Sequence, residues 1–453
     1  MLDSADHSEG NVNRSSWNPV ASAHRDSNCK LRDRWIPSSS PSASPSATQW
    51  TWLSQFVGIL YRRTRLDDDN ESYLRAGTNG PPSGAQLAAV YDGADFSEET
   101  LMKNWPIALI FALGLAALTI PSAQAASCMT VTITGSVGGP QAYQGNANAG
   151  TLVSYGDDTN NCSAVRLQFD AGRGTLQRLS QIPVTSAQLN AVFFTHMHND
   201  HSEGFIDLMQ NRWHFFPTSS KIDVVCSEDA PTAFGVALSC RNFVAHVGDA
   251  LIQSGEIAQR RSEDRRRAEG GPAAMTNLMT FHPKDEPQAV WSSGDVKVNA
   301  IRSTHIAGHA SYRVDTPAGS AVIGGDAGND TLTPPRPSST SAQVEALAKG
   351  VDVIVHSTMH PVMGPDRDSG MPPVVFYRQS TAPDLGAMAQ RTGAKILVLT
   401  HLSPPTGTTQ LGAWKVPGGP LSEDDYRKAA QDGGFKGQII VAKDLANFRL
   451  PAK

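Results

Sequence analysis

The sequence predicts an α/β protein, and three observations support this fold class. Segments with the apolar pattern of strands alternate with helical segments through residues 126–453. Two continuous apolar runs, 351–355 and 396–400, are typical of strands buried on both faces of a parallel sheet. Histidine and aspartate side chains follow several of these strands directly.

The predicted elements follow one another in order along the chain. We expect strands over 129–134, 165–169, 191–195, 296–301, 311–315, 320–324, 351–355 and 396–400. Helices are expected over 202–212, 340–349 and 383–392. The last two are each followed by a glycine, which favours helix ends because it adopts left-handed backbone conformations without strain. The run Ser422-Glu-Asp-Asp resembles a capping box, so a final helix is expected to begin there.

Charges of both signs fill the segment 250–275, which predicts a solvated helix with ion pairs between successive turns. The alternative is an insertion that approaches the active site.

The composition is that of an ordinary soluble protein. The chain has 453 residues, of which 40% are hydrophobic and 18% are charged, and its formal net charge is −5. This length corresponds to roughly three domains of about 150 residues. The charge excludes a strongly basic protein that binds nucleic acid mainly through counterion release.

Residues 102–125 have the three parts of a secretory signal peptide. A basic start at Lys103 precedes an apolar run from Ile107 to Ile120 and an Ala-Gln-Ala end. The apolar run is shorter than the roughly 20 residues that span a membrane, so no stable span is expected after cleavage. We expect residues 1–101 to be either an artefact of the start site or a disordered extension rich in serine and proline. The mature protein, 126–453, would then be periplasmic or secreted.

The cysteines agree with export. Apart from Cys29 in the doubtful extension, the chain has four, an even number that is typical of disulfide pairing in an oxidising compartment. Proximity in sequence favours the pairs Cys128–Cys162 and Cys226–Cys240. A lipid-anchored Cys128 is the alternative.

The strongest chemical signal is a cluster directly after the strand at 191–195. It places His196, His198, Asp200 and His201 within six residues. Imidazole and carboxylate groups are zinc ligands. In an extended segment residues 196 and 198 project to the same side and can bind one metal ion, while the two residues that follow can face a second.

This cluster matches the H-x-H-x-D-H signature of the metallo-β-lactamase superfamily, and the resemblance extends over most of residues 128–445. It implies a four-layer αβ/βα sandwich with two Zn²⁺ ions at its edge, although such sites also accept manganese or iron. Asp326 then resembles the metal-bridging aspartate and His401 the last ligand. Asp170 resembles a structural aspartate that orients its neighbours and does not bind metal.

The third metal motif leaves two candidates. His305 precedes the pair Tyr312-Arg313 by seven residues, as in ribonuclease Z-like and arylsulfatase-like members. His309 follows a glycine as in glyoxalase-like members, but Ala310 breaks that motif. With His305 preferred, the implied ligands of the first metal are His196, His198 and His305, and those of the second are Asp200, His201 and His401, with Asp326 bridging.

The resemblance also implies the catalytic groups. A metal-bound hydroxide is the expected nucleophile, and Asp200 is expected to orient it. His356 occupies the place of the first residue of the ribonuclease Z motif His-Glu-Ala-Thr, which predicts a proton donor to the leaving group. Ser357 replaces the glutamate, so a structural histidine is the equal alternative. His360 is a weaker candidate for the same role, whereas His214, His246 and His282 are expected to be structural or exposed.

Three functions follow from these residues. The first is an exported dinuclear zinc hydrolase that cleaves a small-molecule ester, with a phosphodiester or aryl sulfate favoured. The second is a ribonuclease Z-like endonuclease that processes tRNA 3′ ends, which the export signal and Ser357 oppose. The third is a non-catalytic metal-binding or redox protein.

Overall fold

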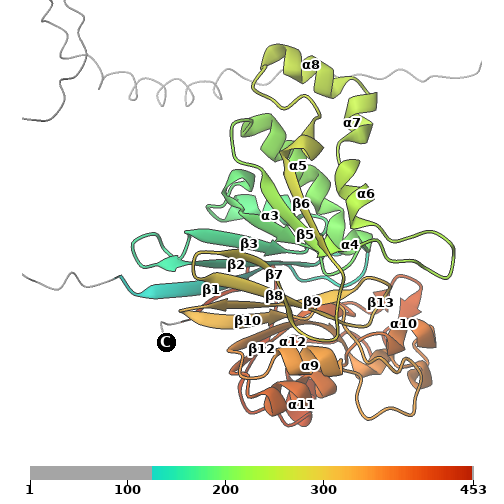
Figure 1. The fold of residues 1–453 in the computed structure, drawn as a ribbon. Helices are drawn as coiled ribbons and strands as arrows, with labels where there is room; N and C mark the ends of the chain where they lie inside the picture. Colours follow the sequence, from blue (N-terminus) through green and yellow to red (C-terminus); the bar gives the residue numbers. More distant parts are fainter. Residues whose placement is uncertain (1–124, 451–453) are drawn as a thin grey trace, which may run out of the picture. The chain divides into compact units, whose positions relative to one another are not determined.

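A computed structural model describes residues 125–450 (Figure 1). The extension 1–101 and the predicted signal segment up to residue 124 therefore lie outside the described residues. Two seven-stranded sheets pack face to face, with strand orders β16-β1-β2-β3-β4-β5-β6 and β15-β12-β11-β10-β9-β8-β7. Helices cover the outer face of each sheet, so the expected four-layer αβ/βα sandwich is confirmed.

The first layer pair comes mainly from the N-terminal half of the described chain. Its strands are β1 (Ser127–Gly135), β2 (Gly150–Asp157), β3 (Val165–Phe169), β4 (Ala191–Phe193), β5 (Ile222–Ser227), β6 (Thr276–Phe281) and the C-terminal β16 (Asn447–Leu450). Its helices are α3 (Thr175–Gln181), α4 (Asn199–Ser202), α5 (Gly204–Phe215), α6 (Cys240–Ala245), α7 (Asp249–Gln253) and α8 (Glu256–Glu263). Strands β3 to β6 are parallel to one another.

The second layer pair comes from the C-terminal half. Its strands are β7 (Gln288–Ser293), β8 (Val296–Arg302), β9 (Ala310–Thr316), β10 (Gly319–Ile323), β11 (Val353–Met359), β12 (Ile396–Ser403) and β15 (Gln438–Val441). Its helices are α9 (Ala342–Leu347), α10 (Pro373–Tyr377), α11 (Ala382–Thr392) and α12 (Glu423–Asp432). A separate small hairpin is formed by β13 (Gln410–Leu411) and β14 (Trp414–Lys415).

Apolar side chains between the two sheets form the central core. Phe169 and Phe193 stack with ring centroids 4.6 Å apart, and Tyr312 of the opposite sheet packs edge-on against Phe193. The Tyr312 hydroxyl donates a hydrogen bond to the Phe194 carbonyl oxygen at 2.7 Å, so its buried polar atom has a partner. Burial of these large side chains fixes how the two sheets lie against each other.

Most of the predicted elements are confirmed, with informative differences at their ends. Strand β4 ends at Phe193, two residues before its predicted end at 195. Strand β11 runs beyond 355 to Met359 and all of its residues are buried. The capping box at Ser422 is present, with the Asp425 carboxylate accepting from the Ser422 N–H at 2.7 Å.

Both disulfides expected from sequence proximity are present. Cys128 pairs with Cys162, and Cys226 pairs with Cys240. The first ties β1 to the turn after β2, and the second ties the end of β5 to the start of α6.

The charged segment 250–275 forms α7, α8 and the turn that follows, and it lies at the far end of the helical layer from β10 and β12 (Figure 1). Arg260 pairs with Glu256 one turn earlier at 3.4 Å, as the solvated-helix prediction expects. Among the described residues, no helix is long and apolar enough to cross a membrane.

Candidate metal centre

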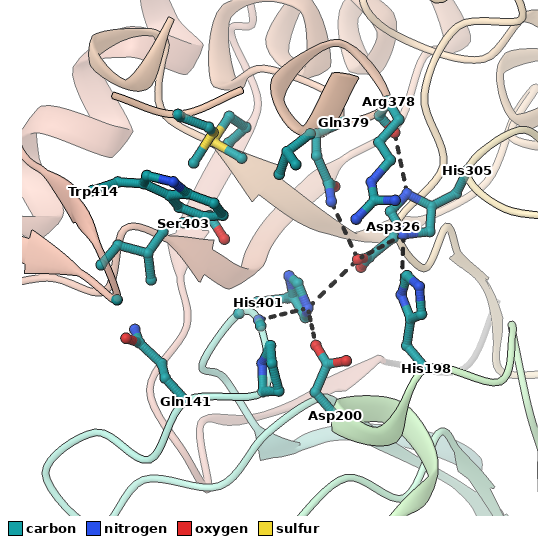
Figure 2. A pocket seen from close by; sticks show the side chains of 18 of the residues that line it. Gln141, His198, Asp200, His305, Asp326, Arg378, Gln379, His401, Ser403 and Trp414 are labelled. Carbon is teal, nitrogen blue, oxygen red and sulfur yellow. Dashed lines mark hydrogen bonds and ion pairs between the residues drawn. The ribbon is translucent and has the colours of Figure 1, made fainter. Parts of the chain in front are cut away.

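The predicted ligands converge where strand ends from both sheets meet (Figure 2). The segment after β4 supplies His196, His198 and the two ligand candidates on α4. The loop between β8 and β9 supplies His305, the turn after β10 supplies Asp326, and β12 carries His401. Parallel strands bring their carboxyl ends to the same edge of a sheet, so residues far apart in sequence meet here.

Three overlapping groups of side chains have ligand atoms within 4.8 Å of one another. The groups are His196, His198 and His305; His196, His201 and Asp326; and Asp200, His201 and His401. The structure thus brings together all seven residues that the resemblance implied.

Asp326 joins these groups. One carboxylate oxygen lies 3.4 Å from His201 Nε2, and the other lies 3.6 Å from both His305 Nε2 and His401 Nε2. A carboxylate in this position can contact two cations at once.

The site passes a test of fit for metal ions. His201 Nε2 and Asp326 Oδ1 are buried and have no hydrogen-bond partner. Buried polar atoms are normally paired, and a cation between these two would satisfy both. Imidazole and carboxylate donors suit zinc, and also manganese or iron.

Asp170 orients two of the histidines, as its expected structural role requires. One carboxylate oxygen accepts the Thr195 N–H at 2.8 Å, and the other accepts the Thr195 hydroxyl at 2.9 Å and lies 2.8 Å from His201 Nδ1. The Thr195 hydroxyl lies 3.0 Å from His196 Nδ1. These contacts leave Nε2 of both rings directed at the cluster, in the arrangement typical of metal-ligating histidines.

His401 reaches the cluster through a β-bulge. In the pairing of β11 with β12, Ser357 faces Thr400 and Thr358 faces Leu402, so His401 has no partner in register. Its φ of 46° is in the left-handed region, which is rare for residues other than glycine. The bulge turns the side chain out of the pleat. His401 Nε2 lies 3.1 Å from Asp200 Oδ2, and the Gly139 N–H donates to the same nitrogen at 3.2 Å.

The geometry distinguishes the two candidates for the third motif. His305 Nε2 lies 3.4 Å from His198 Nδ1, inside the cluster. The two nitrogens of His309 are occupied by the protein, with Nδ1 2.8 Å from Ser303 Oγ and Nε2 accepting the Asp326 N–H at 3.2 Å. His309 therefore supports the loop that carries Asp326.

Interactions between opposite charges shift the pKa values of Asp200, His201 and His401. Burial opposes a charge on His201, but the carboxylates of Asp326 and Asp170 raise its pKa well above the usual value. Burial likewise opposes a charge on His401, whose pKa is raised by Asp326 and Asp200. Despite burial, His201 and His401 lower the pKa of Asp200 to about 2.

The first group stays neutral. Burial lowers the pKa of His196 well below its usual value, and burial lowers that of His305 to about 3. Neutral imidazole is the form that binds a metal ion.

His356, expected to be either a proton donor or a structural histidine, is buried within a strand. It lies inside β11, opposite Leu399 of β12, and is 0% exposed. Its Nδ1 lies 2.7 Å from the Ser357 carbonyl oxygen, and it does not line the cavity described next. Its burial supports the structural alternative.

Among the described residues, His360, the weaker candidate for a proton donor, and the surface residue His246 lie outside the cluster. His360 accepts from the Val362 N–H and packs on Tyr426. His246 pairs with Asp249 at 2.6 Å on the surface.

A cavity of about 480 Å³ opens over the cluster. Its walls include Arg378, Gln379 and Trp414, which sequence reasoning missed. None of the lining residues comes from 250–275, so that segment does not approach this site.

No protein-family model matches the chain. A ribonuclease Z of Mycobacterium avium is 25% identical over 325 residues, which cover 71% of this chain and 98% of the relative. A ribonuclease Z of Mycobacterium bovis is 24% identical over 321 residues, 70% of this chain and 96% of the relative. Among solved structures, the metallo-β-lactamase fold protein YhfI of Bacillus subtilis has a TM-score of 0.45 at 18% identity, covering 71% of this chain and 99% of that one. The short form of human tRNase Z has a TM-score of 0.44 at 15% identity, covering 71% and 99%.

Proposed function

We propose that the chain, which is similar in sequence to ribonuclease Z over 71% of its length, is a metal-dependent hydrolase of the metallo-β-lactamase superfamily that cleaves phosphodiester bonds. The observation that carries the proposal is the set of ligand groups joined by Asp326 at the floor of an open cavity. A site built only to hold metal would not need this opening.

We propose that two zinc ions bind here. His196, His198 and His305 would hold one, and Asp200, His201 and His401 the other, with Asp326 in contact with both. When bound, such ions lower the pKa of a water molecule towards about 7 and polarise a phosphoryl oxygen.

The protein side chains supply positioning and exclusion of water. Asp170 holds His201 in one orientation, and Thr195 transmits the same constraint to His196. Asp200 reaches the cavity surface beside His401, where its carboxylate can accept a hydrogen bond from an attacking water molecule. The apolar part of the cavity keeps the rest of the substrate out of water.

Location outside the cytoplasm is part of the proposal. Two disulfides support an oxidising compartment, because reducing conditions disfavour them. Fractionation of the native host followed by N-terminal sequencing tests it. A mature end near Ala126 agrees, and a full-length chain in the cytoplasm contradicts it.

Precursor tRNA is a second candidate substrate. The similarity to ribonuclease Z spans 98% of that relative, which favours a shared substrate. The proposed export opposes it.

The experiment measures metal content and hydrolysis together on the full chain. The substrates are bis(4-nitrophenyl) phosphate, 4-nitrophenyl sulfate and a precursor tRNA, and the variants are His198→Ala and, as control, the surface change His246→Ala. We expect close to two zinc ions per chain and phosphodiester hydrolysis that is lost only in His198→Ala. Cleavage of the tRNA alone would favour the second candidate, and cleavage of no phosphodiester would overturn the proposal.

A further inference from the structure

The cavity over the metal centre contains a cation without a protein partner. Arg378 directly follows α10, and its backbone carbonyl oxygen lies 3.2 Å from His305 Nδ1. Within the described residues its guanidinium group has no hydrogen-bond or ion-pair partner, and its Nε is buried. Figure 2 shows the side chain on the cavity wall beside His305 and Asp326.

An arginine with free donors at such a place suits an anion. The guanidinium group presents donors in a planar fork that matches the oxygens of a phosphoryl or sulfuryl group. Because the metal centre lies on the same wall, an ester group bound there can present one oxygen to the centre and another to Arg378.

The opposite end of the cavity is apolar. Trp414 lies across from Arg378 in Figure 2. The cavity is also lined by Met359, Met371, Val375 and Leu411. These side chains belong to one hydrophobic cluster, so the wall is packed from behind. An aromatic or apolar group of limited size fits it, since the whole cavity measures about 480 Å³.

Among the described residues 125–450, the cavity lining offers no titratable side chain that is free to donate a proton to a leaving group. Its titratable side chains are His198, Asp200, His305, Asp326, His401 and Arg378. The first five belong to the proposed ligand set, and guanidinium groups do not act as proton donors to leaving groups in proteins. Gln379 is a neutral amide 3.4 Å from Asp326 Oδ2, and His356 is fully buried outside the lining.

We infer that the substrate is a small anionic aryl ester, an aryl phosphodiester or an aryl sulfate, whose acidic phenol leaves unprotonated against the Trp414 wall while Arg378 binds the anionic oxygen. This inference rests on the proposed function and names its substrate class. In the phosphodiester case a bond forms between the water oxygen and phosphorus, and the phosphorus–aryl oxygen bond breaks. The electron pair leaves on the phenolate, and one water proton passes to solvent.

The test compares phosphodiesters that differ only in the leaving group. Methyl 4-nitrophenyl phosphate and methyl phenyl phosphate are assayed with the full zinc-loaded chain. General acids typically contribute about 10²- to 10⁴-fold, so without one we expect the phenyl ester to react at least about 100-fold more slowly. Rates for the two esters within about 10-fold of each other would overturn the inference that the phenolate leaves without a proton donor. The ratio of 4-nitrophenyl sulfate to 4-nitrophenyl phosphodiester hydrolysis separates the two ester types.

Arg378 is tested by Arg378→Gln and Arg378→Lys. We expect Arg378→Gln to raise KM for methyl 4-nitrophenyl phosphate about 10- to 100-fold, and Arg378→Lys to restore part of that loss. Arg391→Gln, which removes a surface arginine paired with Glu345 on α9, is the matched control.

Calorimetry of phenylphosphonate binding to the metal-free protein gives a readout that does not depend on turnover. Equal KM and equal phosphonate binding in Arg378→Gln and the parent would overturn the anion site. If the parent hydrolyses no phosphodiester at all, the proposed function itself fails, whatever the variants do.

Discussion

Asp170→Asn is the sharpest test of how the metal centre is organised. The Asp170 carboxylate is buried and accepts from the Thr195 N–H and hydroxyl while it holds His201 Nδ1. The asparagine amide has nearly the same shape but carries a donor on one side and no charge. It cannot satisfy all three partners, so at least one buried group loses its acceptor.

The expected loss follows from these contacts. If the amide nitrogen faces His201, the ring must take the other tautomer, and its Nε2 then carries a proton in place of the lone pair that a metal needs. If it faces the Thr195 N–H instead, a buried backbone donor is left unpaired. A hydrogen bond to a charged group contributes about 1.5–3 kcal/mol. Loss of such a supporting partner lowers metal affinity about 10- to 100-fold.

Zinc affinity measured by competition with a chromogenic chelator is the assay, with urea unfolding of the metal-free protein beside it. Asp223→Asn is the control, because the Asp223 carboxylate also accepts two hydrogen bonds at 2.8 Å, from Asn277 and Trp291, but lies away from the centre. The control should lose stability without losing zinc affinity. The orienting role of Asp170 is wrong if the zinc affinity of Asp170→Asn is within about threefold of that of the parent. It is also wrong if Asp170→Asn and Asp223→Asn lose zinc affinity to the same extent.

Three further predictions follow from the same structure. Burial lowers the pKa of His356 to about 4 from its usual 6.5. As the pH falls, this imidazole is therefore protonated in the unfolded chain before it is protonated in the folded protein, and the folded state is destabilised. Between pH 7 and pH 5 the metal-free parent should therefore lose about 2 kcal/mol more than His356→Asn in urea unfolding, and equal losses would contradict the burial. A reductant should lower the free energy of unfolding by about 3 kcal/mol for each disulfide, since the closed loops span 14 and 34 residues, and an unchanged urea midpoint would count against this. Removing metal with a chelator should lower the midpoint of thermal unfolding and abolish phosphodiester hydrolysis, because an ion that binds only the folded state stabilises it. Added zinc should restore both. A midpoint that does not move would mean that the ligand groups hold no metal.

The parts of the site that sequence predicted are those fixed by short-range pattern. His196 to His201 lie within a few residues after a strand, so their proximity needs no knowledge of the fold. Asp326 and His401 are associated with apolar strands, and the edge where such strands end could be anticipated. Helix ends were predictable for the same reason, as with Gly393, whose φ of 73° closes α11.

The two alternatives for His356 arose from where the strand was expected to end. The apolar run 351–355 placed this histidine at a strand end, where catalytic groups collect. Thr358 and Met359 are also compatible with a buried strand, so β11 continues and His356 lies within it. Met359, the true last residue, is the one that lines the cavity.

Arg378 and Trp414 could not have been identified from pattern. Arg378 directly follows the short helix α10 and Trp414 lies in the small β13–β14 hairpin, and the positions of both depend on tertiary packing. The segments that carry them follow β11 and β12 and pack into the hydrophobic cluster of Met363 and Phe376. Only that packing brings a lone cation and an aromatic ring to opposite ends of one cavity.

Two site residues, Asp170 and His401, adopt left-handed backbone conformations with φ of 52° and 46°. For residues with a side chain such conformations cost about 1–3 kcal/mol and persist only where surrounding contacts impose them. At Asp170 the imposing contacts are the hydrogen bonds to Thr195 and His201, and at His401 they are the bulge in β12 and the Asp200 carboxylate. The strain is thus located where one residue orients ligands and another is a proposed ligand itself. Glycine at either position would relieve the backbone strain but would also remove the side chain that orients or binds the metal. The free energy of unfolding of the metal-free protein and its metal affinity should therefore change in opposite directions or by unequal amounts in each glycine variant.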